Sequence, residues 1–220
     1  KQAAVRAEEL SRTQRGFKAK LVRDVHALKK AVKDFREEWL KNGPGVPGIE
    51  PDKALSRLNR CKEELAIMVR KFELYTGGED LFAMPQTEYP ELQQTLKEVK
   101  LFDQLFGLYT DVKTAMENWQ EFTWAQVPEN IEDMSTQMDG FALRCKKMPG
   151  RLRSYDAYQA LKKQIEDFQV VLPLLQDLAK PSIMPRHWDE LRALTKQEFD
   201  ENSAEFKLSS LIGLHLEEVA

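Results

Sequence analysis

The sequence predicts an all-α fold: an elongated antiparallel bundle of about five long helices, followed by a shorter C-terminal helical segment. Three observations lead to this prediction. Apolar residues recur in alternating steps of four and three, as in a heptad stripe, over most of the chain. Clusters of glycine and proline separate the striped stretches. The sustained alternation with period two that is typical of strands is not found before residue 206.

Each long helix is predicted by its own apolar stripe. The five stripes cover residues 21–39, 54–75, 92–119, 131–148 and 158–175. The third has extra apolar residues, which widen its face enough to contact more than one neighbour. A shorter helix is expected from about Arg186 to Thr195, and the type of the last apolar segment, FKLSSLIGLHL at residues 206–216, is left open.

Glycine and proline predict where these helices end. Three glycines and three prolines lie within residues 43–51, so we expect a loop there. Gly77 and Gly78 are expected to stop the second helix. Pro173 lies inside the fifth stripe, where it removes one backbone donor and should bend or break the helix near residue 170.

The charge pattern gives no reason to expect a nucleic-acid or membrane surface. The formal net charge is -3, and Lys and Arg are interleaved with Asp and Glu. No stretch approaches the apolar length of a membrane span, and the first ten residues lack the apolar core of a secretory signal. Cys61 and Cys145 fall on stripe positions and are expected to be buried, reduced thiols. We expect a soluble intracellular protein and, because the sequence opens on Lys1 without methionine, a piece of a longer chain.

Patterns that carry chemistry are missing from the sequence. The glycine clusters lack the Gly-Lys-Ser/Thr of a phosphate-binding loop, and no Cys or His lies near enough to either cysteine to form a metal pattern. Paired acids such as Glu63 and Glu64 lie between stripe positions, where a solvated helix face accounts for them. His187 and Asp189 would point in different directions on a helix and lack a nucleophile. The sequence therefore predicts no catalytic residue, cofactor or metal.

One stretch of the sequence resembles a known protein family. FQVVLPLLQDLAKPSIMPRHWDEL, at residues 168–191, resembles the signature of the dynein heavy-chain region that joins the tail to the linker. That signature is Leu-Pro-Leu-(Leu/Ile), about ten residues, then Arg-His-Trp and a helix. Residues 143–168 are similar to the turn and helix that precede it, with Tyr155 where a Trp is common. NGPGVPGIEP (42–51) and YTGGEDLFAMPQTEYPEL (75–92) are similar to segments of axonemal outer-arm heavy chains of the gamma type, and the resemblance covers about residues 35 to 212.

The resemblance implies a non-catalytic mechanical or scaffold segment of a microtubule motor of the ciliary axoneme, located in the cytoplasm and its cytoskeleton. In this family ATP is hydrolysed in a ring elsewhere in the chain, and a linker swings across that ring. Residues 1–127 would form a long-helix region of the tail or neck, and residues 128–220 would lead into the linker. The implied partners are other dynein heavy chains, intermediate and light chains, and the linker and ATPase ring of the same heavy chain. No nucleic acid or membrane is implied.

The residues expected to matter are structural. They should pack or direct the chain where the helical neck meets the linker: Leu172, Pro173, Leu174, Leu175, Pro185, Arg186, His187 and Trp188. Two other interpretations stay open. The chain could be an autonomous spectrin-like helical scaffold or tether that binds protein partners, or a small helical enzyme whose site these patterns do not reveal.

Overall fold

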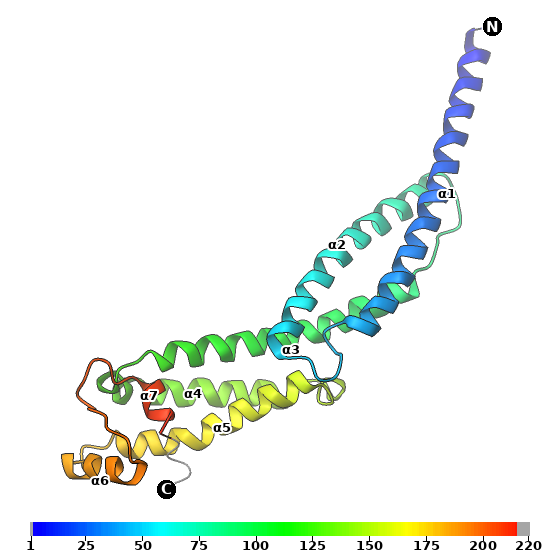
Figure 1. The fold of residues 1–220 in the computed structure, drawn as a ribbon. Helices are drawn as coiled ribbons and strands as arrows, with labels where there is room; N and C mark the ends of the chain where they lie inside the picture. The colour runs from blue at the N-terminus through cyan, green and yellow to red at the C-terminus, as the bar shows by residue number, and fades with distance from the viewer. Residues whose placement is uncertain (1, 215–220) are drawn as a thin grey trace. The chain divides into compact units, whose positions relative to one another are not determined.

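The structure, a computed structural model, describes residues 2–214 and the side chains from Val5 onward. Its elements are α1 (Gln2–Asn42), α2 (Pro51–Leu81), α3 (Pro90–Gln120), η1 (Trp124–Gln126), α4 (Val127–Lys146), η2 (Gly150–Leu152), α5 (Asp156–Leu178), α6 (Pro185–Thr195) and α7 (Leu208–Ile212) (Figure 1). The predicted all-α class is confirmed. The open segment at 206–216 contains the short helix α7, and its last two residues lie outside the described part.

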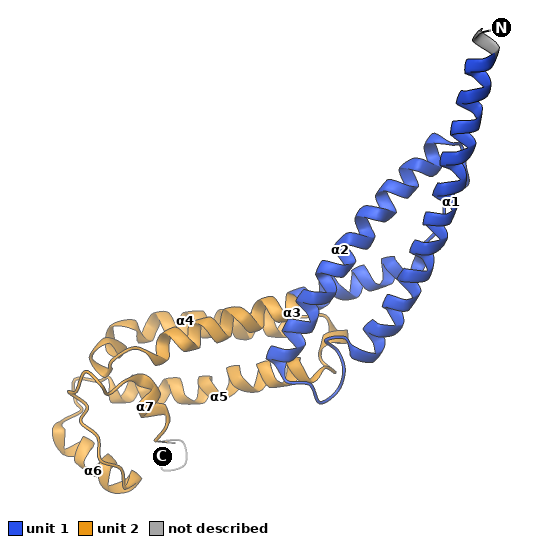
Figure 2. Cartoon of the chain, turned by 45° about the horizontal axis from the view of Figure 1, so that its top comes forward, with its two compact units in different colours: residues 1–103 blue, residues 104–220 orange. Residues whose placement is uncertain are grey.

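The chain divides into two compact units, residues 1–103 and residues 104–220, with the boundary inside α3 (Figure 2). In unit 1, α1 and α2 are antiparallel, because the Arg57 side chain bonds the Asn42 carbonyl near the connecting loop while Gly78 approaches Leu21 far from it. In unit 2, α4 and α5 are antiparallel in the same way: Tyr158 reaches Cys145 near the turn.

The apolar stripe of α1 forms the core of unit 1. Its buried members follow the predicted spacing: Val25, Leu28, Val32, Phe35 and Trp39. They meet buried residues of α2 and of the first part of α3, and the rings of Trp39 and Phe102 are 5.8 Å apart in an edge-on contact. Burying such side chains supplies most of the favourable free energy of folding.

A polar cluster ties α1 to α3 inside unit 1. The guanidinium of Arg36 donates to both carboxylate oxygens of Glu98 at 2.6 and 2.9 Å, and the indole N–H of Trp39 donates to the same carboxylate at 2.8 Å. Arg36 also donates to the hydroxyl of Thr95. These hydrogen bonds, that of Arg36 above all, hold the pKa of Glu98 below its ordinary value.

The prediction that Gly77 and Gly78 stop the second helix is wrong. Helix α2 runs through both glycines to Leu81. A Cβ at Gly78 would lie 3.0 Å from the Leu21 side chain, so the glycine lets α1 and α2 approach closely. The predicted loop at residues 43–51 is confirmed as far as Glu50, since α2 begins at Pro51.

Helix α2 ends at Leu81, and two residues later Ala83 adopts a left-handed conformation with φ of 48°. The N–H of Met84 bonds the Glu79 carbonyl at 2.8 Å, and the N–H of Ala83 bonds the Asp80 carbonyl at 3.0 Å. This pair of bonds is the Schellman motif, here built without a glycine at the left-handed position. The following chain is held by Thr87, which donates through its N–H and its hydroxyl to the buried Glu79 carboxylate.

The core of unit 2 is built by the second part of α3 with α4 and α5. Trp119 of α3 stacks on Phe168 of α5 with ring centroids 5.4 Å apart. Helix α5 continues through Pro173 to Leu178, so the predicted alternative of a break there is wrong. Pro173 lies on the exposed side of the helix, where water can bond the carbonyl that lost its partner. A bend at this point stays a prediction.

The structure also bears on the predicted burial of the two cysteines and on the apolar length of the helices. Cys145 is buried, as predicted, but Cys61 is only half-buried, and its partial burial raises the pKa of its thiol. In the part of the chain that the structure describes, no helix is long and apolar enough to cross a membrane.

Candidate functional site

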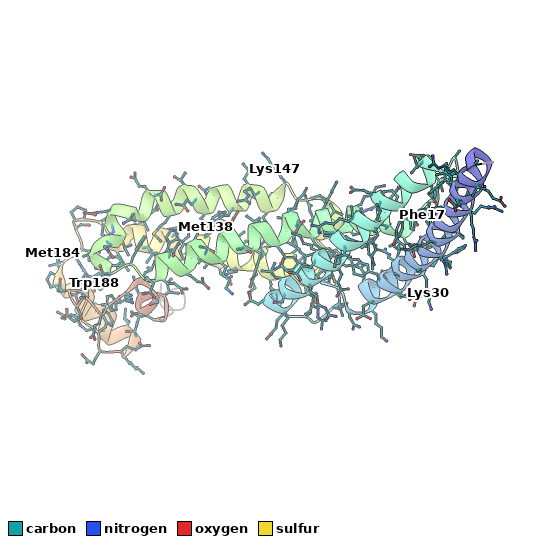
Figure 3. The ribbon with its side chains drawn as sticks, turned by 90° about the horizontal axis from the view of Figure 1, so that it is seen from above. Phe17, Lys30, Met138, Lys147, Met184 and Trp188 are labelled. Atoms are coloured by element: carbon teal, nitrogen blue, oxygen red, sulfur yellow. The ribbon has the colours of Figure 1, made fainter. Side chains whose placement is uncertain are left out.

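The predicted junction residues lie on two helices of unit 2. Leu172, Pro173, Leu174 and Leu175 belong to the last turns of α5, and Pro185, Arg186, His187 and Trp188 form the first turn of α6. Leu172, Leu175 and Trp188 are buried, Leu174 and His187 are half-buried, and Pro173, Pro185 and Arg186 are exposed. Figure 3 labels Trp188 and Met184, which mark the start of α6.

His187 caps the start of α6. Met184 is extended, with φ of -107° and ψ of 161°, and Pro185 takes the first helical position, where its missing N–H costs nothing. The N–H of Met184 donates to Nδ1 of His187 at 2.8 Å. Asp189 is bound to Arg192 rather than to His187. The arrangement is that of a helix cap.

Four aromatic rings form a chain of contacts around Trp188. The ring of Trp188 meets Trp124 edge-on at 5.2 Å and Phe199 edge-on at 6.2 Å. Phe199 in turn stacks on Phe206 at 5.0 Å. Each such ring pair stabilises the fold by more than the burial of its apolar area alone. The four rings therefore hold η1, α6 and the segment after α6 together.

Arg192, one helical turn after Trp188, holds the segment that follows α6. It donates to Asp189 at 2.6 Å, to Glu201 at 2.8 Å and to the Phe199 carbonyl at 3.0 Å. Its guanidinium carbon lies 5.3 Å from the centre of the Phe199 ring, a cation–π geometry. The hydrogen bonds that Arg192 donates to Asp189 and then to Glu201 raise the pKa of its guanidinium.

Backbone hydrogen bonds attach residues 196–208, which we call the returning segment, to residues 122–124, just after the end of α3. Lys196 is left-handed, with φ of 54°, and ends α6. The N–H of Trp124 donates to the Phe206 carbonyl at 3.1 Å, and the N–H of Leu208 donates to the Phe122 carbonyl at 2.8 Å. Lys207 also forms an ion pair with Glu121. The site is thus a junction, made of η1, α6 and residues 196–208, that binds distant parts of unit 2 to one another.

The similarity of this chain to known proteins lies in this region and extends beyond it. The family described as "Dynein heavy chain, N-terminal region 2" matches residues 92–220, more than half of the chain. The chain belongs to the dynein heavy chain family. The predicted resemblance is therefore confirmed, and the matched residues include the whole junction of this dynein segment.

Individual relatives of the dynein segment are axonemal. It is 37% identical over 206 residues to "Dynein gamma chain, flagellar outer arm" of Chlamydomonas reinhardtii, covering 94% of this chain and 4% of that protein. It is 35% identical over 205 residues to "Dynein axonemal heavy chain 8" of Homo sapiens, covering 93% of this chain and 4% of the relative. It is 32% identical over 208 residues to "Dynein axonemal heavy chain 5" of Rattus norvegicus, covering 94% of this chain and 6% of that relative. The dynein segment thus spans a small part of these relatives.

Sequence reasoning found Trp188 in this dynein segment but missed its partners. Arg192, Phe199, Glu201 and Phe206 carry most of the contacts that hold the returning segment, and none of them was predicted. Residues 196–207 have no helical period, so spacing gives no signal for their side chains. The placement of Arg192 four residues after Trp188, on the same helix face, is the one signal that pattern analysis could have used.

Proposed function

We propose that this chain is a non-catalytic mechanical segment of an axonemal dynein heavy chain that joins the tail to the linker. Residues 1–127 would belong to the tail or neck, and residues 128–220 would lead into the linker. ATP would be hydrolysed in a ring elsewhere in the heavy chain, and this segment would transmit the resulting movement. Its site of action would be the axoneme of a cilium or flagellum.

Family and relatives support this proposal. The matching family is an N-terminal region of dynein heavy chains, and the three relatives are flagellar outer-arm or axonemal chains. The same relationship supports assembly with other heavy chains and with intermediate and light chains. It also favours a motor segment over the autonomous spectrin-like tether that the sequence pattern leaves open.

The observation that carries the mechanical role is the way the junction is cross-linked. A force applied to the chain after residue 208 reaches residues 121–124, just after α3, through the Leu208 and Trp124 hydrogen bonds and the ion pair of Lys207. It also reaches α6 through Arg192, which holds Glu201 and the Phe199 carbonyl. Several links that must break together resist a load better than a single flexible connection does.

The test uses the full-length heavy chain in its assembled motor, with Trp188→Ala and Arg192→Ala made together. We expect the rate of ATP hydrolysis to be retained while the speed of microtubule gliding falls, because the stroke is no longer passed on. Arg60→Ala is the matched control, since Arg60 pairs with Glu64 on an exposed face of α2 in unit 1. Unchanged gliding in the double variant would contradict the proposal, and so would loss of ATP hydrolysis itself.

A further inference from the structure

The turn between α4 and α5 concentrates positive charge. Residues 144–153 contain five Lys or Arg and no acidic residue, although the net charge of the chain is -3. Arg144, the first of the five, forms an ion pair with Asp111 of α3. The other four are exposed, and none of them pairs with a carboxylate of the described residues. We call these four the α4–α5 patch: Lys146, Lys147, Arg151 and Arg153.

The helix ends beside the turn account for only part of this charge. Lys146 and Lys147 complement the negative end of α4, and Arg153 donates to the Lys146 carbonyl at 3.1 Å. Arg151 has no such role, because it precedes the start of α5, whose positive end disfavours a nearby cation. Four like charges within residues 146–153 also repel one another. The stability of the turn therefore does not explain the patch.

The acidic residues around the turn leave the patch positive. Asp111 is paired with Arg144, and Glu166 of α5 is paired with Lys162. Asp156 lies in the first turn of α5, where it complements the positive end of that helix. One carboxylate at the edge of the turn does not balance four exposed cations.

The backbone that carries the patch is held in place on both sides. Met148 and Leu152 are buried, so they anchor the turn from within. The N–H of Leu152 donates to the Pro149 carbonyl at 2.9 Å, and the side chain of Gln159 donates to the Arg153 carbonyl at 2.6 Å. The four cations are thus kept close together before any ligand arrives, which reduces the entropic cost of binding one.

One exposed apolar side chain adjoins the patch. Leu143 is 52% exposed and lies one helical turn before Lys147, on the same face of α4. None of residues 144–153 is aromatic. Figure 3 labels Lys147, which lies at the end of α4 that is remote from the junction around Trp188. The surface therefore offers four cations beside a single leucine.

We propose that the α4–α5 patch binds an acidic segment of a partner protein, with an apolar side chain of that segment against Leu143. Carboxylates are the groups of a protein that pair with guanidinium and ammonium ions, and a polypeptide supplies them together with apolar side chains. Because the patch lies at the other end of α4 from the junction, this inference goes beyond the mechanical role of the segment.

Other anionic partners fit this surface less well. The bases of a single-stranded nucleic acid would find no aromatic ring to stack on, and its repeated phosphates favour a longer basic groove. A membrane surface takes up an apolar helix face, whereas this turn exposes one leucine. A second copy of the chain, meeting this one patch to patch, would bring like charges together.

The test is a binding measurement with the 220-residue protein and a fluorescently labelled peptide of about ten residues, long enough when extended to span the turn. The peptide has one Leu at its centre and Glu at the other positions, and binding is followed by fluorescence anisotropy. We expect saturable binding that weakens as salt is added. Lys147→Glu and Arg151→Glu together should raise the dissociation constant by about tenfold or more. Both side chains are exposed, so the melting temperature should not change.

Matched variants show whether binding depends on this patch. Lys29→Glu with Lys30→Glu makes the same change of net charge on exposed positions of α1, and it should leave the dissociation constant nearly unchanged. Leu143→Ser should raise the dissociation constant by about threefold, because little apolar area is lost. A peptide with Gln in place of Glu should bind far more weakly.

Several results would overturn the proposal. They are equal binding of the Glu and Gln peptides, or unchanged affinity in the Lys147 and Arg151 variant or in Leu143→Ser. Tighter binding of a single-stranded oligonucleotide or of anionic lipid vesicles than of the Glu peptide would assign the patch to another class of partner. Self-association through the patch, seen as a mass that rises with concentration and falls back in the Lys147 and Arg151 variant, would do the same.

Discussion

Units 1 and 2 each contain a cluster of tryptophan, arginine and glutamate, but the two clusters connect different kinds of structure. In unit 1, Arg36 and Trp39 of α1 bind Glu98 of α3, between helices whose apolar stripes are already packed. In unit 2, Arg192 binds Glu201 in a segment that follows α6 and is not helical.

This difference determines how much of the surrounding structure each cluster holds in place. If the contact between Arg36 and Glu98 is lost, the apolar seam of unit 1 still aligns α1 with α3. If the contacts around Arg192 and Trp188 are lost, little else holds residues 196–206 against α6. We therefore expect substitutions in the first cluster to lower stability moderately and substitutions in the second to release a segment.

The largest effect is expected for Trp188→Ala. Trp188 is 6% exposed and contacts Trp124 and Phe199, so its truncation leaves a cavity at the junction. The free energy of unfolding should fall by about 3–5 kcal/mol, and the Tm should fall by roughly 10 °C. Thermal unfolding followed by circular dichroism measures both. Leu194→Ala, which removes an exposed side chain of the same helix, should leave the melt unchanged. An unaltered Tm for Trp188→Ala would show that the aromatic chain is not a structural junction.

Glu98→Gln tests the cluster of unit 1 and should have a smaller effect. The change removes the charge that accepts from Arg36 and Trp39, but the Glu98 side chain is 25% exposed, so water screens part of the loss. We expect the free energy of unfolding to fall by about 1–2 kcal/mol. Unfolding by urea at neutral pH measures it. A loss as large as that of Trp188→Ala would remove the contrast between the two units.

The same variant also tests how the contribution of Glu98 to the free energy of unfolding depends on pH. The pKa of Glu98 is lower in the folded chain, chiefly because Arg36 donates to its carboxylate. Its contribution to stability is therefore complete above the ordinary carboxyl pKa, near about 4.3, and is lost as the pH falls through the lower folded value. The difference in unfolding free energy between the unmodified protein and Glu98→Gln should shrink as the pH falls through the ordinary carboxyl pKa and then through the lower folded value. A difference that grows in acid would contradict the role given to Arg36.

The smallest effect is expected at the end of α2, where Ala83 is left-handed. Ala83→Gly should raise the free energy of unfolding by about 0.5–1 kcal/mol, because glycine adopts this conformation without strain.

Gly77→Ala provides a matched comparison with Gly78→Ala. A Cβ at Gly77 meets open space, so alanine should stabilise the helix by about 1 kcal/mol. At Gly78 that gain should be reduced, because the Leu21 side chain must move. Equal gains would mean that the close approach of α1 and α2 does not require Gly78.

The five long helices could be predicted from the sequence because each buries one stripe at heptad spacing. Val25 to Trp39 of α1 show this directly, since every predicted stripe residue among them is buried. The end of α2 could not be predicted, because the glycines that suggested it serve the contact with Leu21 and an alanine takes the left-handed position instead. That choice depends on packing between helices, which a pattern within one helix does not contain.

The junction could be predicted only in part. Trp188 was found because it lies at a marked helix start, but the contacts that hold the returning segment join residues far apart in the sequence. Lys207 and Glu121, for example, are separated by 86 positions. A pairing of this kind leaves no local period, so Arg192, Phe199 and Phe206 could be recognised only once the chain was folded.

The most direct test of the junction is hydrogen exchange at two backbone amides, those of Trp124 and Leu208, which bond across it. Both should exchange slowly in the unmodified protein, and Arg192→Ala should accelerate them together while the amides of the α1 core keep their protection. That result would show that Arg192 holds the returning segment on residues 122–124, just after α3. If the Leu208 amide exchanges at the rate of an unstructured peptide before any substitution, or is unaffected by Arg192→Ala, the junction does not bind these segments together.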